Sequence, residues 1–171
     1  MTTTIAGGRV VLRPVSPDDL LPLAKILATP EVARWWPDYD LARVEREFLA
    51  PDENEHVYAI ETSGALVGAI LSTEEVDPEF RHAAIDLFLD PAVHGRGLGP
   101  DAIRTMAAHL IDVDGHHRLT IDPAADNAAA IRAYEKVGFR PVGRLRRYQR
   151  MLDGSWIDGM LMEMLAEELV R

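Results

Sequence analysis

The stretch that decides the fold class is Leu89-Asp-Pro-Ala-Val-His-Gly-Arg-Gly-Leu-Gly99. Closely spaced glycines let a backbone turn sharply and bring its N–H groups close to a bound group, while the start of a helix carries positive partial charge. The stretch therefore predicts a strand, a loop that cradles a phosphate or pyrophosphate, and a helix. Considered alone, it is equally compatible with a plain tight turn. Its spacing excludes a P-loop, which ends in Gly-Lys-Ser/Thr, and the GxGxxG turn of a dinucleotide-binding fold.

The segments on both sides of this loop alternate between strand-like and helix-like patterns. Before it, residues 83–89 alternate, with Ile85, Leu87 and Leu89 on one face and Asp86 on the other. After it, residues 103–111 carry apolar side chains at helical spacing. Further strands are predicted at 10–13, 57–61, 66–72, 119–122, 141–150 and 156–165, and further helices after Ser16, in parts of 31–49 and at 128–137. This alternation predicts one α/β domain over 1–171, with a mixed sheet flanked by helices.

Composition and charge limit the functions that the chain can have. It has no cysteine, which excludes disulfides, cysteine-ligated metals and a cysteine acyl-enzyme. A formal charge of −10 disfavours nucleic-acid and anionic membrane surfaces and favours a cationic partner, although acidity can also serve solubility alone. Residues 1–8 do not resemble a signal peptide, and no stretch approaches the ~18 apolar residues of a membrane span. We expect a soluble, cytoplasmic protein that requires no metal and has no nucleic-acid or membrane partner.

A second pattern follows the loop by some 30 residues: Asn127-Ala-Ala-Ala-Ile-Arg-Ala-Tyr-Glu-Lys-Val-Gly-Phe139. The two patterns together resemble the GNAT superfamily of acetyltransferases, whose loop reads Gln/Arg-x-x-Gly-x-Gly/Ala and whose helix reads Asn-x-x-Ala-x-x-x-Tyr-x-x-x-Gly-Phe. The loop departs from the family pattern at His94, which stands where Gln or Arg is usual. Pro100 also removes a backbone N–H, so that Asp101 or water must supply any donor needed there.

The resemblance implies a GNAT fold, in which the strands at 83–89 and 119–122 splay apart and admit the pantetheine arm of acetyl-CoA. It also implies direct transfer of the acetyl group to an amine. In such enzymes Asn127 would contact the pantetheine, backbone amides near Phe88 and Leu89 would polarise the thioester carbonyl, and Tyr134 would protonate the leaving thiolate. The residues expected to bind acetyl-CoA are Phe88, Leu89, His94, Gly95, Arg96, Gly97, Leu98, Gly99, Asp101, Asn127, Ala130 and Tyr134. The alternative for Tyr134 is a core tyrosine packed on Ile131 and Val137.

Asp86 is the candidate base. A carboxylate on a half-buried strand needs a partner or a function. An acceptor amine arrives as an ammonium and must lose a proton, so Asp86 would act as a base after burial raises its pKa, act through water, or only anchor the ammonium. The alternative is a structural Asp86, bonded to a neighbouring backbone N–H or paired with Arg81 or Arg132.

Nearly the whole chain is also similar to aminoglycoside 6′-N-acetyltransferases. The similarity rests on an early Val-Leu-Arg-Pro, the pair Trp35-Trp36, Ile85-Asp-Leu87, and Thr120-Ile-Asp-Pro123 leading into 127–139. It implies that Asp86 is the base and that Asp122 contacts the antibiotic's amines. Trp35 and Trp36 would stack on a sugar ring or fill the core, and Asp122-Pro123 would otherwise be a strand end. Residues 74–79 are shorter than the matching insertion in that family, which changes the expected antibiotic range.

The end of the chain, Asp153-Gly-Ser-Trp-Ile-Asp158-Gly-Met, resembles GNAT enzymes that acetylate ribosomal protein N-termini, and Asp158 would extend the acidic pocket. The sequence thus predicts an acetyl-CoA-dependent N-acetyltransferase that modifies the 6′-amine of aminoglycosides and confers resistance. The expected substrate partner is a cationic small-molecule amine, and a homodimer is left open. Two alternatives remain: transfer to another amine, such as a polyamine, a siderophore precursor or a protein N-terminus, and a non-catalytic acyl-CoA-binding module.

Overall fold

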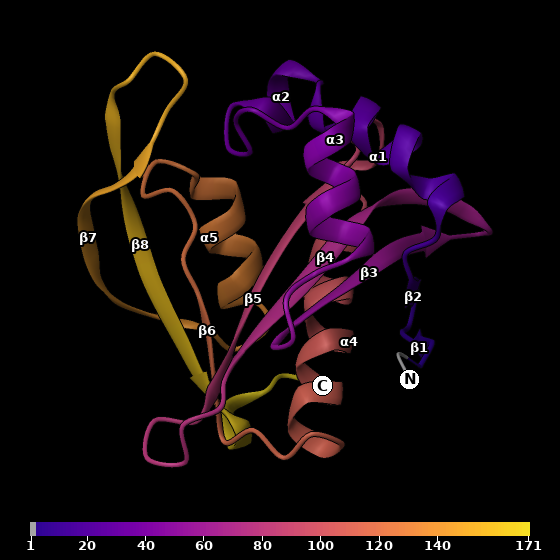
Figure 1. The fold of residues 1–171 in the computed structure, drawn as a ribbon. Coiled ribbons are helices and arrows are strands. Elements are labelled where there is room, and N and C mark those ends of the chain that lie inside the picture. Colours follow the sequence, from indigo (N-terminus) through magenta and orange to yellow (C-terminus); the bar gives the residue numbers. More distant parts are fainter. Residues whose placement is uncertain (1–2) are drawn as a thin grey trace.

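The computed structural model describes residues 3–171 and is built around one eight-stranded sheet with the order β1-β2-β3-β4-β5-β6-β8-β7 (Figure 1). All neighbouring strands are antiparallel except β5 and β6, which are parallel. The strands are β1 (Ile5–Ala6), β2 (Val11–Pro14), β3 (Glu55–Thr62), β4 (Ala65–Glu75), β5 (His82–Leu89), β6 (Arg118–Ile121), β7 (Arg140–Arg150) and β8 (Trp156–Leu165). The predicted mixed sheet is confirmed.

Helices cover both faces of the sheet and enclose two apolar cores. On one face lie α1 (Leu20–Leu27), α2 (Pro30–Ala33) and α3 (Leu41–Val44), the last continued by a π-helical turn at Glu45–Leu49. On the other lie α4 (Leu98–Asp112) and α5 (Ala128–Glu135). Single 3-10 turns occur at Pro17–Asp19, Pro91–Val93 and Ala166–Glu168.

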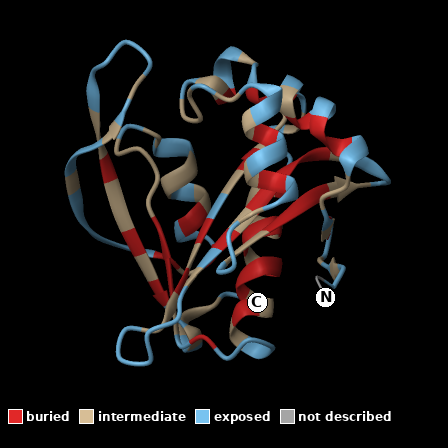
Figure 2. Cartoon of the chain, viewed as in Figure 1, coloured by how far each residue is buried: buried red, intermediate tan, exposed pale blue. Residues whose placement is uncertain are grey.

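The buried side chains follow the periodicities of the sequence (Figure 2). In α4, the positions 103, 106, 107 and 110 are all buried, because they form one stripe at helical spacing. In β5, Ile85 joins the core beneath α4, and Phe88 joins the core beneath α1 and α3. Residue 86 therefore faces the α1 and α3 side, as the alternation predicts.

The sheet opens between its two parallel strands. β5 pairs with β4 along its whole length, from His82 opposite Glu75 to Leu89 opposite Gly68. Its pairing with β6 is limited to Ala83 and Ala84. Beyond that point the two strands diverge, and β6 and β8 lean away from β5 in Figure 1. The splayed central pair is confirmed.

Some boundaries differ from the sequence-based expectation. The strand predicted at 119–122 spans Arg118–Ile121, and the helix predicted at 128–137 ends at Glu135. Gly138 has a φ of 124° and follows that helix, and a Cβ there would lie 2.4 Å from the carbonyl oxygen of Glu168. Only glycine fits this turn, so the predicted glycine stop is correct although the last helical turn is shorter. The short strand β1 was not predicted, because two residues carry no periodicity.

An ion pair joins β2 to the start of the first helix. Both terminal nitrogens of Arg13 donate to the carboxylate of Asp19 at 2.7 Å, and the N–H and hydroxyl of Ser16 donate to the same carboxylate at 2.8 Å. Asp19 is 5% exposed. The hydrogen bond from Arg13 holds the pKa of Asp19 at about 2, below its ordinary value of 3.8.

Replacing Asp19 with asparagine is expected to lower the free energy of unfolding by about 2 kcal/mol at pH 7. A depressed pKa stabilises the fold fully above the unfolded value near 4, and this contribution is lost as the pH falls through about 2. Urea unfolding at pH 7 and at pH 2 measures the difference, which should be largest at pH 7. Asp112→Asn, which removes an exposed pair with Arg171, is the control and should leave the midpoint unchanged. Equal stability of wild type and Asp19→Asn at pH 7 would contradict the assignment.

Candidate active site

The loop before α4 has the backbone expected of an anion cradle. Gly95 and Gly97 adopt left-handed φ values of 75° and 77°, and Gly97 is the residue from which α4 begins. A Cβ on Gly95 would meet no atom within 4 Å, so glycine is needed there for its conformation and not for space. The first N–H groups of a helix have no partner within the helix. Residues 95–99 therefore fit a pyrophosphate, and Arg96 within this stretch is exposed.

One residue of this loop and one in the first turn of α4 have contacts that differ from the roles expected for them. The ring nitrogen Nε2 of His94 lies 3.0 Å from the carbonyl oxygen of Leu89 and donates to it, so His94 ties the loop to the end of β5. The N–H of Asp101 donates to Gly97 at 3.3 Å, and its carboxylate accepts from the N–H groups of Arg9 and Val10 at 2.7 and 3.1 Å. Asp101 thus anchors the chain before β2 to α4, and its N–H is already used within the helix.

The open side of β5 presents backbone donors to the gap between β5 and β6. The N–H of Asp90 donates to Val67 of β4 at 2.7 Å. Because N–H groups of a strand alternate in direction, that of Phe88 also points toward β4, while those of Leu87 and Leu89 point into the gap. The expectation that Phe88 supplies an amide to the thioester is therefore not supported by the ladder. Leu89 fits that role, whereas the N–H of Leu87 already donates to the carboxylate of Asp86.

Asp86 lies on β5 where the sheet opens. Its oxygen Oδ1 accepts from the N–H of Leu87 at 2.8 Å, and its side chain reaches solvent in a recess between protein segments. Surrounding protein atoms displace water from the carboxyl group, and this desolvation disfavours its charged form. Desolvation, more than the charge of Asp122, raises the pKa of Asp86 to about 7. Arg81 is not its partner, since that guanidinium donates to the carbonyls of Asp114 and Gly115. A carboxyl group with this pKa can accept a proton near neutral pH.

Asp122 and Tyr134 lie near Asp86. Asp122 follows β6, and its carboxylate accepts a hydrogen bond from the hydroxyl of Tyr148. Burial raises the pKa of Asp122, while the bond from Tyr148 opposes that shift. Tyr134 is 6% exposed, and its pKa is raised by burial and then by the charges of Asp86 and Asp122. Its ring also packs edge-on against Phe139 with centroids 6.4 Å apart, so it is a core residue that faces the two carboxylates.

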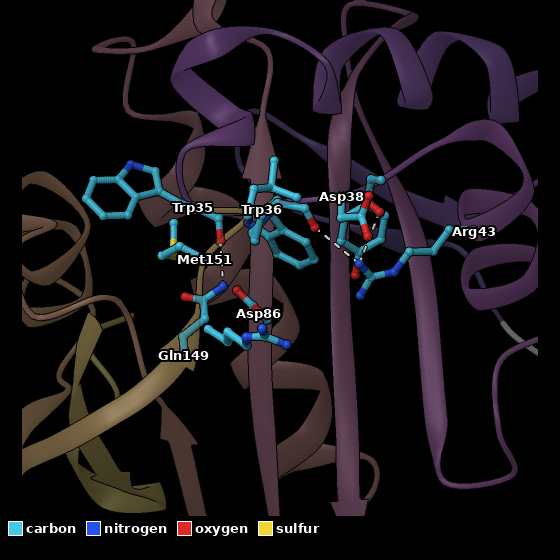
Figure 3. Close-up of a pocket in the computed structure, with 11 residues that line it drawn as sticks. Trp35, Trp36, Asp38, Arg43, Asp86, Gln149 and Met151 are labelled. Atoms are coloured by element: carbon cyan, nitrogen blue, oxygen red, sulfur yellow. Dashed lines mark hydrogen bonds between the residues drawn. The ribbon is translucent and has the colours of Figure 1, made fainter. Parts of the chain in front are cut away.

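Two pockets, each of about 560 Å³, meet at Asp86. We call them the Trp35 pocket and the Glu55 pocket; they share Trp36, Tyr39 and Asp86. The Trp35 pocket is lined by Trp35, Trp36, Pro37, Asp38, Tyr39, Arg43, Asp86, Gln149, Arg150, Met151 and Leu152 (Figure 3). The Glu55 pocket is lined by Trp36, Tyr39, Arg46, Glu47, Ala50, Pro51, Asp52, Glu55, Leu71, Thr73, Ala84, Ile85, Asp86 and Asp122.

The two tryptophans have different environments. Trp36 packs edge-on against Phe88, with centroids 5.2 Å apart, and so combines a core contact with a pocket surface. The Trp35 ring has the guanidinium of Arg34 over it at 4.6 Å, and its carbonyl accepts from Gln149 at 3.1 Å. This last contact joins the β7–β8 hairpin to the segment after α2 (Figure 3). Sequence reasoning missed Tyr39 and Gln149, since neither lies in a recognisable pattern.

The structure does not bring Asp158 to Asp86. Its carboxylate accepts from Arg144 at 2.9 Å and from the N–H of Arg147 at 2.8 Å, and it lines neither pocket. These bonds hold its pKa below the ordinary value. Asn127 caps α5 by accepting from the N–H of Ala130 at 3.2 Å, which leaves its amide NH₂ for a ligand. Residues 3–171 contain no group of three or more potential metal ligands and no helix long and apolar enough to cross a membrane.

Comparison with known proteins agrees with this geometry. The family model described as acetyltransferase (GNAT) domain matches residues 9–140. The chain is 33% identical to N-alpha-acetyltransferase RimI of Mycobacterium tuberculosis over 117 residues, 68% of each protein. It is 29% identical to aminoglycoside N(6′)-acetyltransferase type 1 of Klebsiella pneumoniae over 159 residues, 82% of this chain and 78% of that protein.

Among solved structures, aminoglycoside acetyltransferase AAC(6′)-Ib in complex with coenzyme A and kanamycin superposes with a TM-score of 0.77 at 25% identity. The superposition covers 93% of this chain and 96% of that one. Fold, splayed strands, glycine loop and family match agree with one another. The chain therefore belongs to the GNAT family of acetyltransferases.

Proposed function

We propose that this N-acetyltransferase transfers the acetyl group of acetyl-CoA to the 6′-amine of an aminoglycoside. The observation that carries the proposal is the position of Asp86, a carboxyl group with a pKa near 7 at the point where two pockets and the opening of the sheet meet. It rests also on the similarity to aminoglycoside acetyltransferases over most of the chain. A cytoplasmic location and a single domain over 1–171 belong to the same proposal, and the homodimer stays a prediction.

The residues divide the work as follows. Acetyl-CoA supplies the acetyl group as a thioester, and residues 95–99 hold its pyrophosphate. Asp86 takes a proton from the ammonium of the acceptor, directly or through water, which frees the nitrogen lone pair. The N–H of Leu89 donates to the carbonyl oxygen of the acetyl group. As the C–N bond forms and the C–S bond breaks, Tyr134 donates its hydroxyl proton to the sulfur. The nitrogen loses its second proton to solvent as the amide forms, and Tyr134 regains a proton from solvent.

The acidic wall of the Glu55 pocket favours an acceptor with several positive charges. Asp52, Glu55 and Asp122 line it together with Asp86. Among residues 3–171, the carboxylates of Asp52 and Glu55 form no ion pair or hydrogen bond, whereas Glu47 is held by Arg43 and Arg46. Two unpaired carboxylates near the base can bind additional ammonium groups of one ligand. An aminoglycoside or a polyamine has such groups.

A protein N-terminus is the second candidate acceptor. The 33% identity to an N-alpha-acetyltransferase favours it. Arg150 also lines the Trp35 pocket and makes no ion pair within the described part of the chain, so it can receive an acidic or carbonyl group of a peptide.

A thiol-release assay with acetyl-CoA separates these candidates. The informative acceptors are two aminoglycosides that differ only in a 6′-amine or a 6′-hydroxyl, together with spermidine and short peptides with free N-termini. We expect release with the 6′-amine compound and at least tenfold less with its 6′-hydroxyl partner. Faster release with spermidine or a peptide would replace the proposed acceptor, and acetyl-CoA binding without release for any amine would indicate a binding module.

Salt is expected to weaken acceptor binding more than acetyl-CoA binding. Raising ionic strength from about 0.05 to 0.5 M shortens the screening length and weakens attraction between the acidic wall and several ammonium groups. We expect the KM for the aminoglycoside to rise several-fold, with a smaller change for acetyl-CoA. Initial rates at fixed pH measure both constants, with potassium chloride as the only variable. A larger rise for acetyl-CoA would contradict the acidic-pocket assignment.

A further inference from the structure

Strand β7 has a bulge next to the candidate site. Its register with β8 shifts between Leu145 and Gln149, and Arg147 inside the bulge has a left-handed φ of 50°. A residue with a side chain adopts this conformation only when its surroundings hold it. Asp158 does so by accepting the N–H of Arg147 and, through its other oxygen, the guanidinium of Arg144. Bulges redirect the side chains that follow them, and the next residue is Tyr148.

Tyr148 lies across a glycine on the neighbouring strand. A Cβ on Gly159 of β8 would come within 2.7 Å of ring atom Cδ1 of Tyr148. The missing side chain therefore makes the space in which the ring rests. From this position the hydroxyl of Tyr148 donates to Oδ2 of Asp122. The bulge, the ion pair of Asp158 and Gly159 thus all help to position the hydroxyl of Tyr148 against Asp122.

The hydrogen bond from Tyr148 to Asp122 affects the pKa values of both Asp122 and Asp86. The bond from Tyr148 stabilises the charged form of Asp122 and opposes the upward shift of its pKa. The same bond raises the pKa of Tyr148 to about 12, so its hydroxyl keeps its proton across the working pH range. The charge of Asp122 in turn contributes to the raised pKa of Asp86. The hydroxyl of Tyr148 therefore lowers the proton affinity of Asp122 relative to that of Asp86.

We propose that Tyr148 is a positioning residue that keeps Asp122 as the charged carboxylate, so that Asp86 is the group that accepts the proton from the ammonium. The proton leaves nitrogen and ends on a carboxylate oxygen of Asp86, while Asp122 remains an anion. This inference rests on the proposed function.

Several other charged or titratable groups face this pair from the surrounding elements. The segment 34–52, which includes α3, contributes Asp38, Tyr39, Arg43, Arg46, Glu47 and Asp52. Strand β3 contributes Glu55, helix α5 contributes Tyr134, and β7 contributes Arg150. All of these remain in the variants below, so a change in titration reports the loss of the Tyr148 hydroxyl.

Tyr148→Phe removes the hydroxyl and keeps the ring. Without the donor, more of the pair's single proton resides on Asp122, and a higher pH is needed to ionise both groups. We expect the acidic limb of the kcat/KM profile to move up by about one pH unit, with wild-type activity recovered at high pH. Activity near pH 6 should then be roughly tenfold lower than that of wild type. Gly159→Ala, which displaces the ring, should show the same shift.

Tyr58→Phe is the matched control, since that tyrosine lies in the core beneath α4 on the opposite face of the sheet. Its profile should coincide with that of wild type. An unchanged acidic limb in Tyr148→Phe, or an equal loss of activity at every pH, would overturn the inference.

A second measurement needs no turnover. Carbon-13 titration of the aspartate carboxyl groups in the free protein should show the upper pKa of the Asp86 and Asp122 pair rise in Tyr148→Phe, and an unchanged titration would overturn the inference. Because the titration is independent of any acceptor, it separates failure of this inference from failure of the proposed function. Wild-type protein that releases no thiol with any amine would refute the proposed function, whatever the titration shows.

Discussion

Asp86→Asn is expected to lower kcat/KM for the acceptor amine by roughly 10²- to 10⁴-fold, the range typical of a lost general base. Asparagine has nearly the same shape, and it cannot accept the proton of the ammonium. The wild-type rate should fall below about pH 7 as Asp86 binds a proton, and this limb should be absent from the variant. Thiol release measured from pH 5 to 9 tests both expectations.

Asp126→Asn provides the control for that experiment. Asp126 is exposed and lies in the same segment as Asp122, between β6 and α5. Its loss removes one negative charge without changing the base, so activity should stay within about twofold, as a single exposed charge contributes little. Binding of acetyl-CoA and the melting temperature should be unchanged in both variants. Retained turnover in Asp86→Asn would remove Asp86 as the base and leave it an anchor at most.

Tyr134→Phe is expected to lower kcat by roughly ten- to a hundredfold, at or below the low end of the range for a general acid, because a thiolate leaves readily even without a proton. Phenylalanine keeps the edge-on contact with Phe139, so folding should be preserved. The KM for acetyl-CoA should change little, because the hydroxyl acts on the leaving group. Steady-state rates with acetyl-CoA varied at saturating acceptor separate the two constants.

A purely structural Tyr134 would give a different result. The sequence also allows a core tyrosine, and the structure shows that the ring is in the core. If packing is its only role, the phenylalanine variant will turn over like wild type and melt at the same temperature. A higher KM for acetyl-CoA with unchanged kcat would also contradict the acid role.

The fold could be predicted because its elements have local signals. The glycines at 95, 97 and 99 mark the turn into α4, and its buried positions repeat at helical spacing. Gly138 is a stop signal that the structure requires sterically. Such features depend on neighbours within a few residues, and periodicity reports them. The splay of β5 and β6 has no signal of this kind, and it was expected only through the family resemblance.

The site was predicted less completely because its contacts join distant segments. Gln149 and Trp35 are 114 residues apart in the chain, and Asp101 binds Arg9 across 92 residues. No local pattern indicates either pairing. Tyr148 lies in an arginine-rich stretch that is typical of a solvated strand face, and only the bulge and Gly159 direct it to Asp122.

The divergence of β5 from β6 also bears on aggregation, because it leaves part of β5 without a partner strand. A strand with unpaired N–H and C=O groups is a template for another chain, which makes open edges prone to aggregation. Here the unpaired stretch lies in the interior of the sheet, with Leu87 and Leu89 partly buried, and not at an outer edge. A second protein could pair with this stretch only by inserting an extended segment between β5 and β6. A slender arm that carries its own amides can do so, and pantetheine is such an arm. Under the proposed function, the ligand-bound sheet would therefore gain a ninth, non-peptide member in the gap between β5 and β6.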